Sequence, residues 1–231
     1  MKQEFVEDGI RYQENYNSVI VCGFEDKSNH LLPTAINLVI PSKVRDIPVK
    51  AIAPYAFIGD NRIRSITFSE DMDIIGQMAF LSCKNLKSVT ITSVTKLTNK
   101  FTTPLIISNE AFGNCENLEV IGDKKMSRTV TMLSHAFKYC THLTQVNMWI
   151  QEIHAFSFFK SGVKKLKFQP DAALKENCLL YSDIESITLH DACSLDTQVW
   201  DSIKSQNITI VCLATSNLTY LAYEGFKIEI I

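Results

Sequence analysis

Several features that mark membrane, nucleic-acid-binding and exported proteins are missing from this sequence. No apolar run in the 231 residues approaches the roughly 20 that cross a bilayer, so no membrane insertion is predicted. The formal net charge is -2 and the isoelectric point about 6.2, whereas a nucleic-acid-binding domain is usually clearly basic; no nucleic-acid partner is predicted. The N-terminal segment carries acidic residues where a signal peptide has its apolar core, so no signal peptide is visible.

Glycine and paired cysteines are also scarce, which argues against most cofactor and metal sites. The eight glycines form no Gly-x-Gly-x-x-Gly loop, and neither a Gly-x-Ser-x-Gly elbow nor a His-Glu-x-x-His pair occurs. Seven cysteines are too few for a disulfide scaffold, and no two have the Cys-x-x-Cys spacing of a zinc or redox site. We therefore predict no enzyme, no cofactor and no bound metal.

What the sequence does contain is a repeat built on one apolar anchor residue. The anchors are spaced by 23, 32, 25, 21 and 21 residues, and they are Phe57, Phe80, Phe112, Phe137, Phe158 and Leu179. An apolar residue lies five positions before each anchor, and a tail of the form Leu-x-x-Val-x-Ile follows it. The last two units are one residue shorter between anchor and tail, and the third unit has Asp123 at its last tail position.

The repeat predicts a solenoid, because a unit of this length cannot bury its own apolar side and must stack on its neighbours. The tail has the period of two expected of a short strand with one buried face, so stacked tails predict a parallel sheet. The half with the anchor predicts a turn or a short helical bend. Cys83, Cys115 and Cys140 each lie three residues after an anchor, where we expect small buried free thiols rather than disulfides between coils.

The units resemble BspA-like leucine-rich repeats. The stretches that carry the resemblance are "IAPYAFIGDNRIRSITF", "IGQMAFLSCKNLKSVTI", "ISNEAFGNCENLEVI" and "MLSHAFKYCTHLTQVNM". Residues 9–57 are similar to the strand-rich leader of many members, and residues 208–231 to their closing cap. The resemblance implies an α/β repeat solenoid of the leucine-rich-repeat type, right-handed and strand-rich with short helical turns. It would be a single elongated domain with N- and C-terminal caps.

Within this one continuous domain we expect three parts. A strand-rich leader or cap occupies residues 1–49, six repeats occupy residues 50–190, and a C-terminal cap occupies residues 191–231. An insertion rich in Thr and Lys, at about residues 92–106, separates the second and third anchors. Insertions in solenoids usually emerge as loops on one face.

The function implied by the resemblance is non-catalytic recognition of other macromolecules, as protein binding or cell adhesion at a microbial surface. The implied partner is a protein, such as a host extracellular-matrix or surface protein. The implied location is the cell surface or the secreted fraction. The organism, the oligomeric state and the choice between a protein and a carbohydrate ligand stay open.

Candidate binding residues lie between the buried positions of the tail strands, which face outward on the concave side in repeats of this kind. One such column consists of Ser69, Thr92, Lys124, Trp149, Gln169 and His190. An exposed Trp is a typical interface anchor. The predicted ligand-binding residues are Trp149, Gln145, Asn147, Lys165 and Lys167, with Lys124 and Gln169 beside Trp149 in the neighbouring coils. The alternative is that Trp149 folds over the edge of the core and that the lysines form an ordinary solvated face.

Two other functions stay open. One is a structural spacer or a fragment of a larger surface array. The other is a metal-binding or enzymatic protein that uses His135, Cys140 and His142 from the stretch "SHAFKYCTHL". A metal would need these side chains to converge with at least one further donor, whereas the repeat predicts Cys140 in the core and His142 at the surface.

Overall fold

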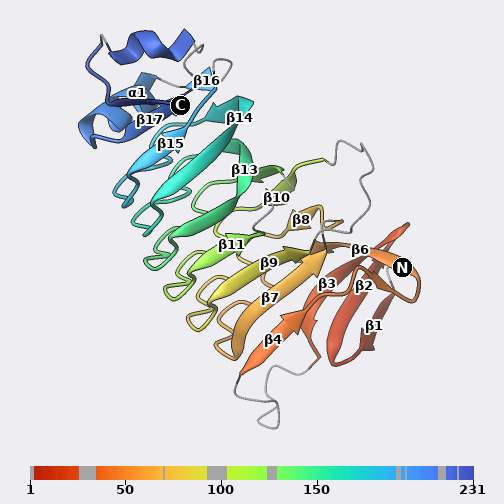
Figure 1. Cartoon of the computed structure of the whole chain (residues 1–231). Helices are drawn as coiled ribbons and strands as arrows, with labels where there is room; N and C mark the ends of the chain where they lie inside the picture. The colour runs from red at the N-terminus through yellow and green to blue at the C-terminus, as the bar shows by residue number, and fades with distance from the viewer. Residues whose placement is uncertain are drawn as a thin grey trace.

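The computed structural model describes residues 3–25, 35–69, 71–92, 103–123, 129–190, 194–195, 197–212, 217–222 and 224–231. Figure 1 shows them as a stack of coils between N-terminal strands and a C-terminal cap, which confirms the predicted strand-rich solenoid. The strands are β1 (Glu4–Glu7), β2 (Ile10–Asn15), β3 (Ser18–Phe24), β4 (Ile36–Val39), β5 (Lys43–Val44), β6 (Ile47–Ile52), β7 (Ile63–Ser69), β8 (Ile74–Ile75), β9 (Ser88–Thr92), β10 (Leu105–Ile107), β11 (Val120–Gly122), β12 (Thr129–Met132), β13 (Gln145–Ile153), β14 (Lys165–Leu174), β15 (Ser186–Thr188), β16 (Ser194–Leu195), β17 (Thr209–Cys212) and β18 (Ile228–Ile230).

Two parallel ladders of strands run along the stack. The first contains the predicted tails, in the order β4, β7, β9, β11, β13, β14, β15, β17 and β18. The second pairs β3, β6, β8, β10, β12, β13, β14 and β16. Strands β13 and β14 are long enough to belong to both ladders. The predicted parallel sheet is therefore present, and each complete coil contributes a second strand that the periodicity did not indicate.

The leader closes one end of this sheet. Strands β1, β2 and β3 form an antiparallel ribbon, and β3 then pairs in parallel with β6. Strand β4 pairs in parallel with β7 of the first coil. The division at residues 49 and 190 stays a prediction. The insertion expected at about 92–106 lies mostly outside the described residues, and β10 begins within its predicted end.

The halves that contain the anchors are tight turns whose backbone is hydrogen-bonded alternately within and between coils. The N–H of Phe80 donates to the carbonyl of Ala111 in the next coil at 2.8 Å. The following N–H, of Leu81, donates to the carbonyl of Met78 in the same coil at 3.2 Å. The same alternation recurs from coil to coil, so these buried polar groups are paired without a helix.

Left-handed residues explain why this half, predicted as a turn or a short helical bend, is a turn. Residues two before and two after each anchor have positive φ, which a right-handed helix does not allow. Those before the anchors are Tyr55, Met78, Glu110, His135, Phe156 and Asn177. Those after them are Gly59, Ser82, Asn114, Tyr139, Lys160 and Tyr181.

The anchors form an aromatic spine through the centre of the solenoid. Phe57, Phe80, Phe112, Phe137 and Phe158 stack with neighbouring ring centroids 5.2–5.4 Å apart and interplanar angles of 4–10°. All five side chains are buried. The spacing between Phe80 and Phe112 is 5.3 Å although 32 residues separate them, so the insertion between them leaves the stack undisturbed.

A row of thiols runs beside the spine, as predicted. The Sγ of Cys83, Cys115 and Cys140 each donates to the carbonyl of the preceding coil's anchor at 3.0–3.1 Å, and all three are buried and free. Burial raises the pKa of Cys83 to about 12 and raises the pKa of Cys115 and Cys140 from the ordinary value of 9.0. The hydroxyl at the equivalent position of the fifth coil, in Ser161, is buried and has no hydrogen-bond partner among the described residues.

Gly162 marks a close approach between the fourth and fifth coils. Its N–H donates to the carbonyl of Cys140 at 3.1 Å. A Cβ at this position would lie 2.1 Å from the carbonyl oxygen of Thr141. The backbones of the two coils therefore approach too closely for any other residue.

The C-terminal cap covers the last coil with helix α1 (Thr197–Ser205), the 3₁₀ helix η1 (Asn217–Ala222) and strands β17 and β18. Val199 and Ile203 on one face of α1 are buried, and the ring of Trp200 lies 5.3 Å from that of Phe226. In the described part of the chain, no helix has the length and apolar character that crossing a membrane requires.

Truncation of the spine should cost much of the stability. Phe112→Ala removes a fully buried ring that contacts a ring on each side, so the free energy of unfolding should fall by about 3–5 kcal/mol. Ile58→Ala, at a side chain that is 41% exposed, should change it by less than about 1 kcal/mol. Urea denaturation followed by circular dichroism measures both. Equal effects would contradict the central role of the spine.

Gly162→Ala should destabilise the protein by about 1–3 kcal/mol, because the new methyl group meets backbone that cannot move aside. Gly113→Ala is the matched control, since its Cβ would meet the flexible end of the Leu81 side chain at 2.9 Å. Thermal unfolding of the two variants compares them. A melting temperature of Gly162→Ala equal to that of the wild type would show that the coils can separate at this point.

The buried thiols should make stability fall at high pH. Their folded pKa values are raised, so between about pH 9 and the folded pKa the unfolded chain loses protons that the folded chain keeps. Each thiol should lower the free energy of unfolding by about 1.4 kcal/mol per pH unit in that window. Denaturation from pH 8 to 10.5 should show this slope in the wild type and a shallower one in the Cys83→Ala/Cys115→Ala/Cys140→Ala variant. Identical slopes would mean that the thiols ionise in the folded protein.

Candidate functional site

The predicted binding residues lie on one surface, formed by the outward-facing side chains of β13 and β14, which we call the strand face. Gln145 and Lys165 are register partners across these two strands, and both are exposed. Lys165 and Lys167 pair onward with Ser186 and Thr188 of β15. The strands thus hold the two lysines side by side with small hydroxyl-bearing residues.

The neighbours of Trp149 differ from the prediction. Trp149 is the register partner of Lys167 rather than of Gln169, and on its other side it pairs with Thr129. The cause is a register shift between Gln145 and Trp149, where β13 has two more residues than β14. Lys124, the other predicted neighbour, lies outside the described residues.

Trp149 is partly exposed and has a lysine and a histidine nearby. The Nζ of Lys167 is 6.0 Å from the ring centroid, and the ring of His190 is 6.4 Å away at an angle of 50°. His190 was not among the predicted binding residues, although the outward column of Trp149 contains it. The column marked His190 as outward-facing, and the structure places its ring near that of Trp149.

A close backbone contact fixes Asn147. Asn147 pairs with Gly122 of β11, which has a φ of +97°. A Cβ added at Gly122 would lie 2.4 Å from the carbonyl oxygen of Asn147. The glycine therefore lets β11 approach the centre of β13. Asn147 is half-buried between Gln145 and Trp149, and all five predicted residues lie on β13 and β14.

The strand face is positively charged at its centre. Neither Lys165 nor Lys167 has a carboxylate within salt-bridge distance among the residues that the structure describes. By contrast Lys164, which precedes them, lies 3.9 Å from Asp183 and 3.4 Å from Glu185. The two unpaired ammonium groups and the indole ring suit binding, since they supply a cationic and an aromatic contact but no acid–base pair.

The three side chains of the alternative metal site do not converge. The Sγ of Cys140 is turned into the core, the Nδ1 of His142 lies 2.7 Å from the carbonyl of Glu116, and the ring of His135 stacks on Phe156 at 5.3 Å. Across the described ranges, no group of three or more His, Cys, Asp or Glu side chains could hold a metal ion. The metal-binding alternative therefore has no support in the geometry.

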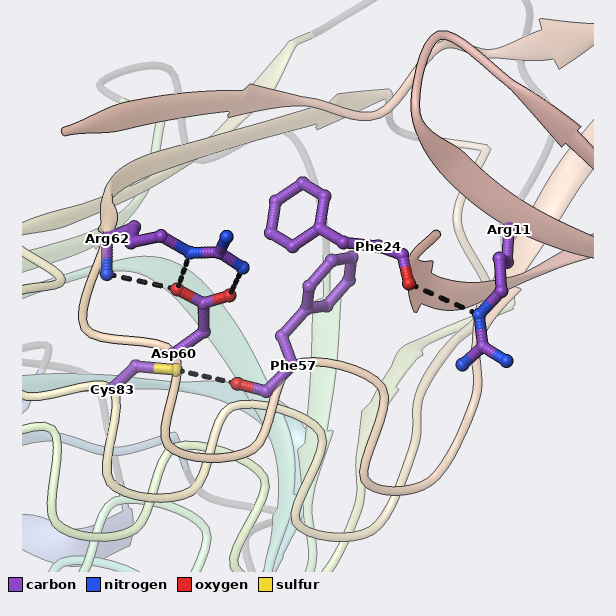
Figure 2. A network of polar contacts seen from close by, with 6 residues as sticks. All are labelled: Arg11, Phe24, Phe57, Asp60, Arg62 and Cys83. Carbon is purple, nitrogen blue, oxygen red and sulfur yellow. Dashed lines mark hydrogen bonds and ion pairs between the residues drawn. The ribbon is translucent and has the colours of Figure 1, made fainter. Parts of the chain in front are cut away.

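A cavity of about 410 Å³ lies at the N-terminal end of the spine, and Figure 2 shows the polar network beside it. Phe24 packs edge-on against Phe57 at 5.0 Å, and the guanidinium of Arg62 lies 5.1 Å from the Phe24 ring centroid. The Nε of Arg62 donates to Asp60 at 2.9 Å in a forked ion pair, and Arg11 donates to the carbonyl of Phe24 at 3.2 Å. The paired charges and the ring cover the end of the spine, so this network is a structural cap.

The comparisons with known proteins include a solved structure that supports this architecture. A search of curated proteins found no significant match. Among solved structures, a T. pallidum leucine-rich repeat protein matches with a TM-score of 0.57 and 19% identity, over 88% of this chain and 95% of that one. A leucine-rich cell surface protein of Faecalibacterium prausnitzii matches with a TM-score of 0.47 and 18% identity, over 82% of this chain and 55% of that one.

The family model for the BspA-type leucine-rich repeat region, with six copies, matches residues 50–171 and 99–206. These two matches together cover more than half of the chain and contain all six anchors. The chain belongs to the BspA-type leucine-rich repeat family.

Proposed function

We propose that the protein binds another protein through the strand face, with Trp149 as the anchor, in adhesion at a microbial surface. The observation that carries the proposal is the partly exposed indole beside unpaired lysines. A Trp in this setting buries a large apolar area against a partner and loses little side-chain conformational entropy. Such residues dominate the binding energy of many interfaces. Membership of a repeat family that acts by binding supports the same function.

The charge of the strand face defines the complementary partner. Lys165 and Lys167 present two ammonium groups that no carboxylate neutralises within the described residues, and the ring of His190 lies near Trp149. An acidic surface with an apolar recess for the indole would complement them. Such charges mainly steer association and select among partners, whereas the buried ring supplies the affinity.

The test uses immobilised fibronectin, fibrinogen and laminin, with the wild type and Trp149→Ala compared by biolayer interferometry. Trp149→Ala should weaken binding about tenfold or more, because truncation of a central anchor typically costs at least 2 kcal/mol. Circular dichroism and thermal unfolding must first show that the variant folds like the parent. Trp200→Phe, in the cap, is the control for changing a tryptophan elsewhere.

A second pair of variants tests the charges. Lys165→Gln/Lys167→Gln should slow association and reduce its salt dependence. The control, Lys43→Gln/Lys227→Gln, makes the same change in net charge at exposed sites elsewhere and should leave the association rate unchanged. If no matrix protein binds, or if binding ignores both Trp149 and these lysines, the strand-face proposal is wrong. A spacer role, or a site elsewhere on the molecule, would then be favoured.

A further inference from the structure

The turns of the last three coils carry a second cluster of side chains, away from the strand face. Figure 1 shows the turns as a row of loops along the stack, at the ends where the strands of the first ladder start. On these loops the ring of Phe159 packs edge-to-face between those of Tyr139, at 5.7 Å, and Tyr181, at 5.6 Å. We call these three residues the aromatic strip. Phe156 packs against the aromatic strip, with its ring centroid 5.9 Å from that of Phe159.

The backbone does not favour these residues. Tyr139 and Tyr181 have φ values of 60° and 56°, in the left-handed region that bulky side chains rarely occupy. The equivalent positions of two earlier coils hold Gly59 and Asn114, which tolerate that conformation. Burial does not explain the choice either, since Tyr181 is 66% exposed. The left-handed backbone therefore gives no reason for tyrosine at either position, and the ring of Tyr181 is accessible to a ligand.

Two lysines flank the strip without a carboxylate partner. The Nζ of Lys138 lies 5.2 Å from the ring centroid of Tyr139, and the Nζ of Lys160 lies 5.7 Å from Tyr139 and 5.6 Å from Phe159. In the part of the chain that the structure describes, neither has a carboxylate within salt-bridge distance. The strip thus presents aromatic rings together with two positive charges.

A hollow of about 440 Å³ adjoins the strip at Tyr139. Its lining consists of Ser82, Lys84, Asn114, Glu116, Tyr139 and Thr141. The Nζ of Lys84 lies 3.2 Å from the carboxylate of Glu116, so these two charges largely offset each other. What remains beside the Tyr139 ring is a wall of hydroxyl and amide groups, which both donate and accept hydrogen bonds.

We propose that the strip and the hollow bind an anionic polysaccharide. The faces of aromatic rings carry partial negative charge and attract the polarised C–H groups of sugar rings. The hydroxyl and amide groups of the hollow match sugar hydroxyls, and the two ammonium groups match carboxylate or sulfate substituents. This surface is independent of the protein-binding site proposed for the strand face.

An extended acidic peptide fits the same surface less well. Peptides that bind along a backbone need free N–H and C=O groups on the receptor. In these turns the N–H of Tyr139 donates to the carbonyl of Phe159 at 2.9 Å, and that of Lys160 to the carbonyl of Leu180 at 3.4 Å. At Tyr139 and Lys160 the backbone N–H groups are therefore committed to the neighbouring coil, and a ligand there meets side chains.

Isothermal titration of the full chain with size-matched oligosaccharides of hyaluronan and heparin tests the proposal. These two probes separate carboxylate from sulfate recognition, neutral dextran controls for sugar alone, and poly-L-glutamate controls for charge alone. At least one anionic oligosaccharide should bind, more tightly than dextran or poly-L-glutamate. Absence of binding by both anionic sugars, or equal binding of poly-L-glutamate, would overturn the proposal.

The decisive variant is Tyr139→Asn/Tyr181→Asn. Asparagine occupies the equivalent left-handed position at Asn114, so the variant should fold and melt at or above the wild-type temperature. Its affinity for the anionic oligosaccharide should fall tenfold or more. Tyr55→Asn, at an exposed left-handed tyrosine of the first coil, is the matched control and should leave affinity unchanged.

Two further variants separate this site from the strand face. Trp149→Ala should bind the oligosaccharide like the wild type, and Lys138→Gln/Lys160→Gln should bind it more weakly with a reduced dependence on salt. Loss of sugar binding in Trp149→Ala, with retention in Tyr139→Asn/Tyr181→Asn, would place the sugar on the strand face and refute the proposal. The protein-binding test of the strand face is unaffected by either result.

Discussion

The spacing between coils is the constraint on which the rest of the molecule depends. It is set by backbone hydrogen bonds, through two parallel ladders of strands and through turns whose alternate N–H groups donate to the next coil. Parallel strands lie about 4.8 Å apart, and the spine rings follow this spacing with a small offset. Every side chain that recurs in the repeat therefore meets its own equivalent in the next coil. Phenylalanine at the anchor works because stacked rings fit that distance.

The same spacing aligns the equivalent outward-facing residues of successive coils in a column. Each surface of the solenoid is therefore formed by residues that occupy the same position of the repeat. On the strand face the column changes from small hydroxyl-bearing residues in β7 and β9 to lysines in β14. On the turns it changes from Gly59 and Ser82 to Tyr139 and Tyr181. Both changes concentrate aromatic and cationic side chains in the C-terminal coils. The N-terminal coils are closed by the leader and by the paired charges of Asp60 and Arg62.

Most of the core was predictable from the sequence because it repeats. The anchors, the thiols and the tail strands of the repeats follow from residue spacing, and the structure contains them. The surroundings of Trp149 were not predictable, because a register shift within β13 leaves no trace in a periodic pattern. The left-handed residues that flank each anchor were missed for another reason. A glycine in the sequence suggests a positive φ, whereas tyrosine, methionine and histidine at these positions do not.

The uniform geometry of the middle coils bears on how such a chain can change length. Between Phe80 and Phe137 each coil presents the same parallel ring, the same thiol bonded to the preceding anchor and the same turn hydrogen bonds to the coil on either side. Duplication or loss of a whole coil there would join equivalent surfaces. At Gly122 and at Gly162 a close backbone approach is particular to one junction, and an exchange across either would join surfaces that do not match. Variation in repeat number is therefore most easily accommodated away from these two junctions, with both ends preserved.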